Sequence, residues 1–291
     1  MAKNKEKIKK ANIFKWDSKY NAWTTSDANF KQAQFLINSI NKTEILIDKF
    51  RSLSQSLAQA RELIDVRIRT DVANINKITN DIVFISDQIR NTAGDSLALR
   101  DQRGQLVKEL SEIVDVTAVE TSTGEFQVYI GTGLQIVSES SSGVLSTQAD
   151  AGNEGLVDVL LSVNNGASRD EVTDKFNGGD LAGLLEVRDD IIPGYQNLLD
   201  ELAYTIVTQV NSLHTTGYNL NSATNVRFFG NLASSTDAAA NISLDAAVDG
   251  VPRGIAASGA LGDVPGGNAK ALAIGNLFNA NITFSTGDGT F

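Results

Sequence analysis

FRSLSQSLAQARELIDVRIRTDVANINKITNDIVFISDQI, residues 50–89, decides the fold. Apolar residues recur in it every three or four positions, a spacing that places one apolar stripe along a helix. The phase of the stripe slips by four residues between Ile64 and Ile68, which is a stutter in coiled-coil terms. No proline interrupts residues 30–89, so the sequence predicts a long coiled-coil-like helix there, with a candidate break near Lys42. The stripe consists of Phe50, Leu53, Leu57, Ala60, Ile64, Ile68, Val72, Ile75, Ile78, Ile82, Ile85 and Ile89.

A helix with one apolar stripe has to bury that stripe against other elements. Each buried Ile or Leu contributes about 1.5–3 kcal/mol, so this stripe sets the architecture. Two further helices supply the opposing surface, at residues 96–113 and 180–215. Their apolar faces are Leu99, Leu106, Leu110 and Ile113 in the first, and Tyr195, Leu199, Leu202, Ile206, Val210 and Leu213 in the second. We expect the three helices to pack lengthwise as an elongated bundle.

The apolar period changes to two after Val114, which is typical of strands. Polar and apolar residues alternate up to Ile130 around a turn at Ser122–Gly124, which predicts an antiparallel β-hairpin. Two more strands are expected at 134–137 and 155–163, with the Ser/Gly-rich stretch 138–153 as loop. The fold class is therefore α+β: a long-helix bundle with a small antiparallel β unit at about 114–163.

The sequence indicates three segments. Residues 1–29 are lysine-rich, residues 30–220 form a helical rod domain with the β unit, and residues 221–291 are rich in turn residues. In this last segment we expect a short strand at 241–248 and a short helix at 268–278.

The charge is unevenly distributed. Residues 1–29 carry seven lysines against three acids, a net +4, so residues 30–291 carry −14 of the total of −10. An acidic body repels nucleic acids and anionic membranes, and we expect neither as a partner. The basic segment could contact either of them, although a solvated chain end is the simpler interpretation. The chain has no cysteine, which excludes disulfides and thiolate metal sites.

Candidate catalytic residues are few. His214 is the only histidine, so a Ser-His-Asp or Cys-His arrangement would have to use it. At the end of a helix, an imidazole can instead bond the last carbonyls. The pairs Asp189-Asp190 and Asp200-Glu201 are adjacent in a helix and point in different directions, unlike the converging carboxylates of a glycosidase. The sequence predicts no enzyme, and no catalytic, cofactor-binding or metal-binding residue.

The charged stretch LRDQR lies at the start of the helix 96–113. Arg100, Asp101 and Arg103 flank its apolar face or lie opposite to it, and nothing nearby supplies a nucleophile or a phosphate loop. An arginine guanidinium can fork to carboxylates or carbonyls of a neighbouring helix. We interpret the stretch as a packing and orientation element; a site for small anions is the alternative.

Two blocks carry a family resemblance. LALRDQRGQLVKELSEIVDVTAVETSTGEFQVYIGTGLQIV, residues 97–137, and FNGGDLAGLLEVRDDIIPGYQNLLDELAYTIVTQVNSLHTTGYNLN, residues 176–221, resemble the flagellar hook-associated protein 1 (FlgK) family. The resemblance extends over about residues 30–291. Its structural packing motif is represented here by Arg100, Asp101, Arg103, Leu106, Leu110, Gly178, Gly179, Leu184, Arg188, Asn211, His214 and Gly217.

The resemblance implies a non-enzymatic structural protein without cofactors, shaped like the outer domain of a flagellin-like axial protein. It implies a place at the hook–filament junction of the bacterial flagellum, outside the cell, after export through the flagellar type III channel. The implied partners are copies of itself, the hook protein and the second hook–filament junction protein. A flagellin-like or other axial or adhesive surface protein is the runner-up, and a cell-wall hydrolase ranks behind both.

The sequence departs from the family in two respects. Family members have terminal segments that form an inner coiled coil, and their export chaperone binds near the C-terminus; we expect this chain to be a central fragment without either end. After Tyr218 the family has a glycine-rich turn, where this chain has Asn221, Ser222 and Asn225.

Overall fold

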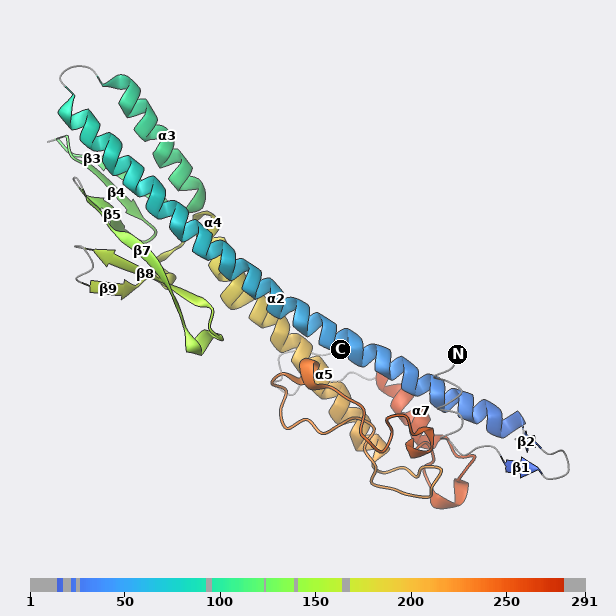
Figure 1. Ribbon diagram of the computed structural model, residues 1–291. Helices are drawn as coiled ribbons and strands as arrows, with labels where there is room; N and C mark the ends of the chain where they lie inside the picture. Colours follow the sequence, from blue (N-terminus) through green and yellow to red (C-terminus); the bar gives the residue numbers. More distant parts are fainter. Residues whose placement is uncertain are drawn as a thin grey trace. The chain divides into compact units, whose positions relative to one another are not determined.

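A computed structural model describes residues 15–17, 22–24, 27–92, 96–122, 124–138, 141–163 and 168–279. The chain divides into two compact units (Figure 1). The first unit comprises residues 1–57 and 195–291, and the second comprises residues 58–194. This division differs from the predicted segments, because the turn-rich residues after 220 belong to the same unit as the start of the long helix.

Helix α2 (Asp27–Asn91) is continuous over 65 residues and supplies both units. The predicted break near Lys42 is wrong, since no glycine or proline lies within the helix to interrupt its hydrogen bonds. The predicted stripe is buried from Ile68 to Ile85, which confirms it there. Phe50 is also buried, whereas Leu57, Ala60, Ile64 and Ile89 are partly buried and Leu53 is 53% exposed.

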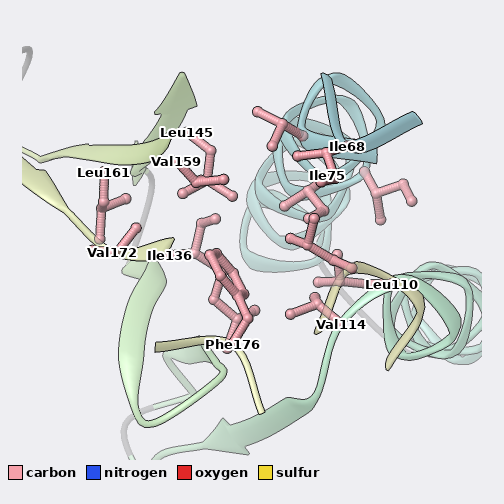
Figure 2. Close-up of a cluster of buried hydrophobic side chains, with 14 of the residues drawn as sticks. Ile68, Ile75, Leu110, Val114, Ile136, Leu145, Val159, Leu161, Val172 and Phe176 are labelled. Carbon is pink, nitrogen blue, oxygen red and sulfur yellow. The ribbon is translucent and has the colours of Figure 1, made fainter. Parts of the chain in front are cut away.

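The core of the second unit lies between helices and two small sheets (Figure 2). Helix α2 contributes Ile68 and Ile75, and helix α3 (Leu97–Ile113) contributes Leu110. Helix α4 (Gly179–Glu186) adds its own buried leucines, Leu181 and Leu185. The sheets close this core with Val128, Ile130, Ile136, Val137, Leu145, Val157, Val159 and Leu161.

Both sheets of the second unit are antiparallel. The strands are β3 (Val116–Glu120), β4 (Phe126–Ile130), β5 (Leu134–Ser138), β6 (Ser141–Ser142), β7 (Val144–Ala149), β8 (Val157–Val163) and β9 (Ser168–Glu171). One sheet has the order β3-β4-β5-β6, and the other has the order β7-β8-β9. The predicted hairpin is confirmed, with Val116 opposite Ile130 and Glu120 opposite Phe126.

The loop predicted at residues 138–153 is wrong. Strands β6 and β7 and the 3-10 turn η1 (Ala151–Asn153) occupy most of it, and β7 pairs with β8 over six residues. Only Leu145 of β7 is deeply buried. The sequence of this strand therefore shows no clear alternation of apolar and polar residues.

A π-helical turn, η4 (Val187–Ile191), joins α4 to helix α5 (Ile192–His214). The helix predicted at 180–215 is therefore one helical run with a π turn inside it. In the first unit, α5 packs on α2: Ala203, Val207 and Val210 meet Ile47 and Phe50 in one cluster.

The rest of the first unit consists of turns and short elements. Strands β1 (Lys15–Asp17) and β2 (Ala22–Thr24) pair antiparallel. The strand predicted at 241–248 is wrong: helix α6 (Ala238–Asn241) ends there, and Leu244 forms only an isolated bridge with Phe229. The predicted short helix is confirmed as α7 (Ala269–Asn276). The remaining 3-10 turns are η3 (Thr173–Lys175), η5 (Pro252–Gly254), η6 (Leu261–Asp263) and η7 (Leu277–Asn279).

Candidate functional site

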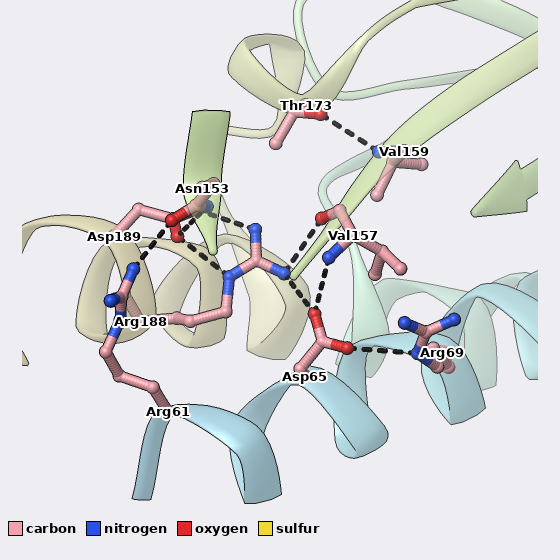
Figure 3. Close-up of polar contacts among 9 residues, drawn as sticks. All are labelled: Arg61, Asp65, Arg69, Asn153, Val157, Val159, Thr173, Arg188 and Asp189. Atoms are coloured by element: carbon pink, nitrogen blue, oxygen red, sulfur yellow. Dashed lines mark hydrogen bonds and ion pairs between the residues drawn. The ribbon is translucent and has the colours of Figure 1, made fainter. Parts of the chain in front are cut away.

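Arg188 anchors a buried polar network in the second unit (Figure 3). Its side chain has no exposed surface. Its Nη1 donates to Asp65 Oδ1 at 2.7 Å and to the Val157 carbonyl at 2.8 Å, while Nε and Nη2 donate to the two carboxylate oxygens of Asp189 at 2.8 and 2.7 Å. One guanidinium thus joins helix α2, strand β8 and the π turn.

The partners of Arg188 are themselves bonded. Asp65 Oδ1 also accepts from the Val157 N–H at 2.8 Å. Arg61 donates from Nε to the carbonyl of Arg188 at 3.0 Å and from Nη2 to Asn153 Oδ1 at 2.6 Å. Asn153 completes the circuit by donating to Asp189 Oδ1 at 2.9 Å. Such mutual satisfaction is what a buried ion pair needs to offset its loss of hydration.

The pKa shifts in this network point away from proton transfer. Burial by itself would lower the pKa of Arg188, but hydrogen bonds and charges from Asp189 and Asp65 raise it. Burial would likewise raise the pKa of Asp189, but the bonds from Arg188 and Asn153 lower it. A general acid or base works best with a pKa near the operating pH. Both groups instead stay charged at neutral pH and hold structure.

The two arginines of the LRDQR stretch converge on a strand rather than on a neighbouring helix. Arg100 Nη1 donates to both carboxylate oxygens of Glu120, at 2.7 and 3.0 Å, and Arg103 Nη2 donates to one of them at 2.8 Å. Arg103 is buried, with its guanidinium carbon 3.8 Å from the centroid of the Phe126 ring. Asp101 is exposed. The stretch therefore fixes α3 to the hairpin β3–β4.

The other predicted motif residues of the second unit lie where α3 meets α4. Leu110 is fully buried and Leu106 packs against the same core, as does Leu184. Gly179 has φ +81°, and a Cβ on it would lie 2.6 Å from the Ile113 carbonyl oxygen. The preceding Gly178 accepts the Asp115 N–H at 3.2 Å. Only glycine fits this approach of backbone to backbone.

The motif residues of the first unit attach loops to α5. Asn211 Oδ1 accepts the N–H groups of Phe228 and Phe229, both at 2.9 Å, and its Nδ2 donates to the Phe229 carbonyl at 3.1 Å. His214 is fully buried. Its Nδ1 lies 2.7 Å from the Val226 carbonyl oxygen, and its Nε2 accepts the Ala256 N–H at 2.8 Å. It bonds these loops rather than the last carbonyls of its own helix.

Gly217 follows α5 in the next turn. A Cβ on it would lie 2.7 Å from the carbonyl oxygen of Ala256. The structure thus brings Asn211, His214 and Gly217 together in the first unit, and the other nine motif residues lie in the second unit. The predicted motif residues therefore make packing contacts in both units.

Several important residues were not predicted. Asp65 and Arg61 continue the phase of the buried residues Ile68–Ile85, one and two steps before Ile68, and lie next to Ile64 and Ala60 of the predicted stripe. Both are about 95% buried. Charged residues at positions that the apolar pattern predicts to be buried indicate buried ion pairs, so the sequence did contain a signal for these two residues.

Asn76 gave no such signal in the sequence. Its Nδ2 donates to the Leu145 carbonyl at 2.7 Å, and its Oδ1 accepts the Leu145 N–H at 2.8 Å.

An open groove of about 680 Å³ lies beside the π turn. Its lining includes Phe176 and five acidic residues, Glu171, Asp174, Glu186, Asp189 and Asp190. Across the described residues, no group of three or more acidic or histidine side chains could hold a metal ion. Among the helices of that same part of the chain, none has the length and apolar character of a membrane span.

Comparison with known proteins identifies relatives. The model of a family described as flagellar hook-associated protein FlgK helical domain matches residues 15–229. This match includes part of the segment 1–29, which the resemblance leaves out. Flagellar hook-associated protein 1 of Salmonella typhimurium (strain LT2) is 29% identical over 196 residues, 65% of this chain and 35% of that protein. The protein of the same name from Escherichia coli K12 is 28% identical over 196 residues, 65% of this chain and 36% of its own length.

A solved structure also resembles this fold. It is that of the flagellar hook junction protein FlgK from Burkholderia pseudomallei, with a TM-score of 0.60 over 79% of this chain and 39% of that one, at 20% identity. This likeness confirms the α+β class. The chain spans little more than a third of each relative, 35 to 39% of its length.

Proposed function

The chain belongs to the FlgK helical-domain family, and we propose on that basis that it is a structural subunit of the bacterial flagellum at the hook–filament junction. Relatives in two enteric bacteria carry the name flagellar hook-associated protein 1. The proposed mechanism is mechanical: long helices provide a stiff element, and polar contacts fix the small sheets and loops to it.

One observation supports a mechanical role most directly. Arg188 and His214 form hydrogen bonds that hold backbone segments in place, and Asp189, a carboxylate of one candidate pair, accepts from the side chains of Arg188 and Asn153. A catalytic group has to present a free atom to a substrate. In Arg188 and His214 the polar atoms are instead buried and used by the fold itself.

The proposed partners follow from the family. They are further copies of the chain, the hook protein and the second junction protein, after export through the flagellar type III channel to the cell exterior. The same proposal predicts no cofactor and no enzymatic turnover.

A chimeric protein tests the assignment. In a Salmonella strain without its own hook-associated protein 1, the 196 aligned residues of that protein would be replaced by those of this chain. We expect hooks that carry filaments, seen by electron microscopy, and restored swimming. A chimera that is exported and stable but leaves every hook bare would contradict the proposed role.

The competing classes predict other outcomes. A flagellin-like protein would restore filaments to a strain lacking flagellin rather than to the strain lacking the junction protein. A cell-wall hydrolase would release soluble fragments from purified peptidoglycan, and Asp189→Asn with Asp190→Asn would abolish that release. We expect the purified chain to release no more than buffer does.

A further inference from the structure

His214 holds two loop segments through hydrogen bonds of opposite sense. The Val226 carbonyl can only accept, so Nδ1, 2.7 Å away, carries the proton and donates. The Ala256 N–H can only donate, so Nε2, 2.8 Å away, is the unprotonated acceptor. The two bonds together specify one neutral tautomer.

The surroundings of the imidazole disfavour its charged form. The side chain is fully buried, and the Phe228 ring meets it edge-on with 5.3 Å between centroids. Burial lowers the pKa of His214, against smaller opposing contributions from the Val226 carbonyl and the charge of Asp245. The charged residues on the segments around the ring are Arg227, Asp245, Asp249, Arg253 and Lys270.

We propose that His214 is an acid-operated clasp, in which protonation of Nε2 releases Ala256 from helix α5 while Val226 stays bound. An imidazolium donates from both nitrogens. The bond from Nδ1 to Val226 therefore survives protonation, but the new N–H on Nε2 faces the N–H of Ala256. Only the Ala256 side of the clasp opens.

The released segment carries further contacts. Ser258 exchanges backbone hydrogen bonds with Tyr218, at 2.9 and 3.2 Å. The Ala257 carbonyl accepts the N–H groups of Lys270 and Ala271, at 2.9 and 3.3 Å, and so holds the start of α7. Opening at Ala256 consequently loosens the attachment of α7 as well.

The direction of the pH effect follows from the lowered pKa. In the open form, His214 titrates near its ordinary value of about 6.5. The closed form binds no proton until the pH reaches its lower pKa, so the contribution of His214 to closure is complete above about pH 6.5. It is lost as the pH falls from there through the lowered pKa.

Amide hydrogen exchange of the full 291-residue chain tests the clasp, because the structure offers matched amides. Leu145 N–H donates to the side chain of Asn76 at 2.8 Å, and Phe229 N–H donates to Asn211 at 2.9 Å; neither acceptor titrates. Between pH 7 and 5, we expect the protection of Ala256 to fall by up to about tenfold per pH unit below 6.5. The protection of the Leu145 and Phe229 amides should stay constant after correction for the pH dependence of the intrinsic exchange rates. Constant protection at Ala256, or an equal fall at all three amides, would overturn the proposal.

Substitution and direct titration provide the second test. His214→Gln offers Ala256 an acceptor that does not titrate, so the pH dependence of Ala256 protection should disappear. Where this variant does not fold, an NMR titration of His214 in the wild-type chain serves as the test, because the chain has one histidine and its proton resonances are therefore unambiguous. An apparent pKa of 6.5 or higher for His214 in the folded chain would refute the clasp.

Discussion

Two attachments of backbone to a helix, one in each unit, use different chemistry. In the second unit the charged Arg188 and Asp65 hold strand β8 at Val157. In the first unit the neutral Asn211 and His214 hold the loops at Phe229 and Ala256. A buried charge costs several kcal/mol of hydration and has to be matched by a partner. A neutral group costs less, and an imidazole adds sensitivity near neutral pH. The attachment at Val157 should therefore persist in mild acid and fail on loss of Arg188, whereas the attachment at Ala256 should weaken in mild acid.

Removal of Arg188 should give the largest effect. Arg188→Met leaves Asp189 without its arginine partner and Asp65 with Arg69 as its ion-pair partner. Breaking a buried ion pair in this way costs about 3–5 kcal/mol. Urea unfolding should show this loss of stability, with amide exchange at Val157 accelerated and exchange at Phe229 unchanged.

Arg90→Met is the control for this test, because Arg90 lies in the same unit and pairs with Asp87, with 48% and 39% of the two side chains exposed. We expect no measurable loss there. Equal unfolding curves for the Arg188 and Arg90 variants would contradict the importance of the buried network.

Gly179→Ala should come next, at about 3 kcal/mol. Alanine at φ +81° is strained, and its Cβ would lie 2.6 Å from three backbone atoms of Ile113 and Val114. Gly183→Ala, with open space around its Cβ inside α4, should leave stability unchanged or raise it by up to about 1 kcal/mol. Thermal unfolding of the pair measures the difference. A loss at Gly183 as large as at Gly179 would mean that the tight approach does not matter.

Asn211→Ala tests the neutral attachment in the first unit. It leaves two N–H groups and one carbonyl of Phe228 and Phe229 without their partner, at a cost of about 2 kcal/mol. Ser212→Ala, at the exposed next position, is the control and should be neutral. Amide exchange at Phe229 should accelerate in the first variant only, and unchanged exchange there would refute the role of Asn211.

The smallest effect concerns the turn after Tyr218. Ser222 and Asn225 have φ of +60° and +58°, a backbone region in which glycine is less strained. Ser222→Gly should therefore stabilise the first unit by about 1 kcal/mol or less, in spite of the greater flexibility of glycine in the unfolded chain. A rise in the unfolding midpoint would show this, and a fall would mean that unfolded-chain entropy outweighs the relief of strain.

The sequence predicted the elements that bury a regular apolar pattern. The stripe Ile68–Ile85, the hairpin and the final short helix all appear as expected. Elements held by polar contacts escaped prediction, since such contacts leave no periodicity. Helix α6 is one of these elements. The carboxylate of Asp200, which lies 39 residues earlier in helix α5, accepts the N–H of Ala239 at 2.8 Å and so caps α6.

The polar network was equally inaccessible to pattern reasoning. Asp65 and Arg188 are 123 residues apart, and only the packing of α2 against the π turn brings them to 2.7 Å. The two arginines of the LRDQR stretch were recognised as orienting groups, yet their partner Glu120 lies on a strand because the hairpin folds back over α3.

Asn76 protects an edge strand against aggregation at high protein concentration. Strand β7 ends its sheet, and an outer strand with free N–H and C=O groups is a template on which another chain can add a strand and start aggregation. The Asn76 side chain bonds both groups of Leu145, so helix α2 takes the place of the missing neighbour at that residue. One amide therefore helps to keep the chain from pairing with another copy through this strand.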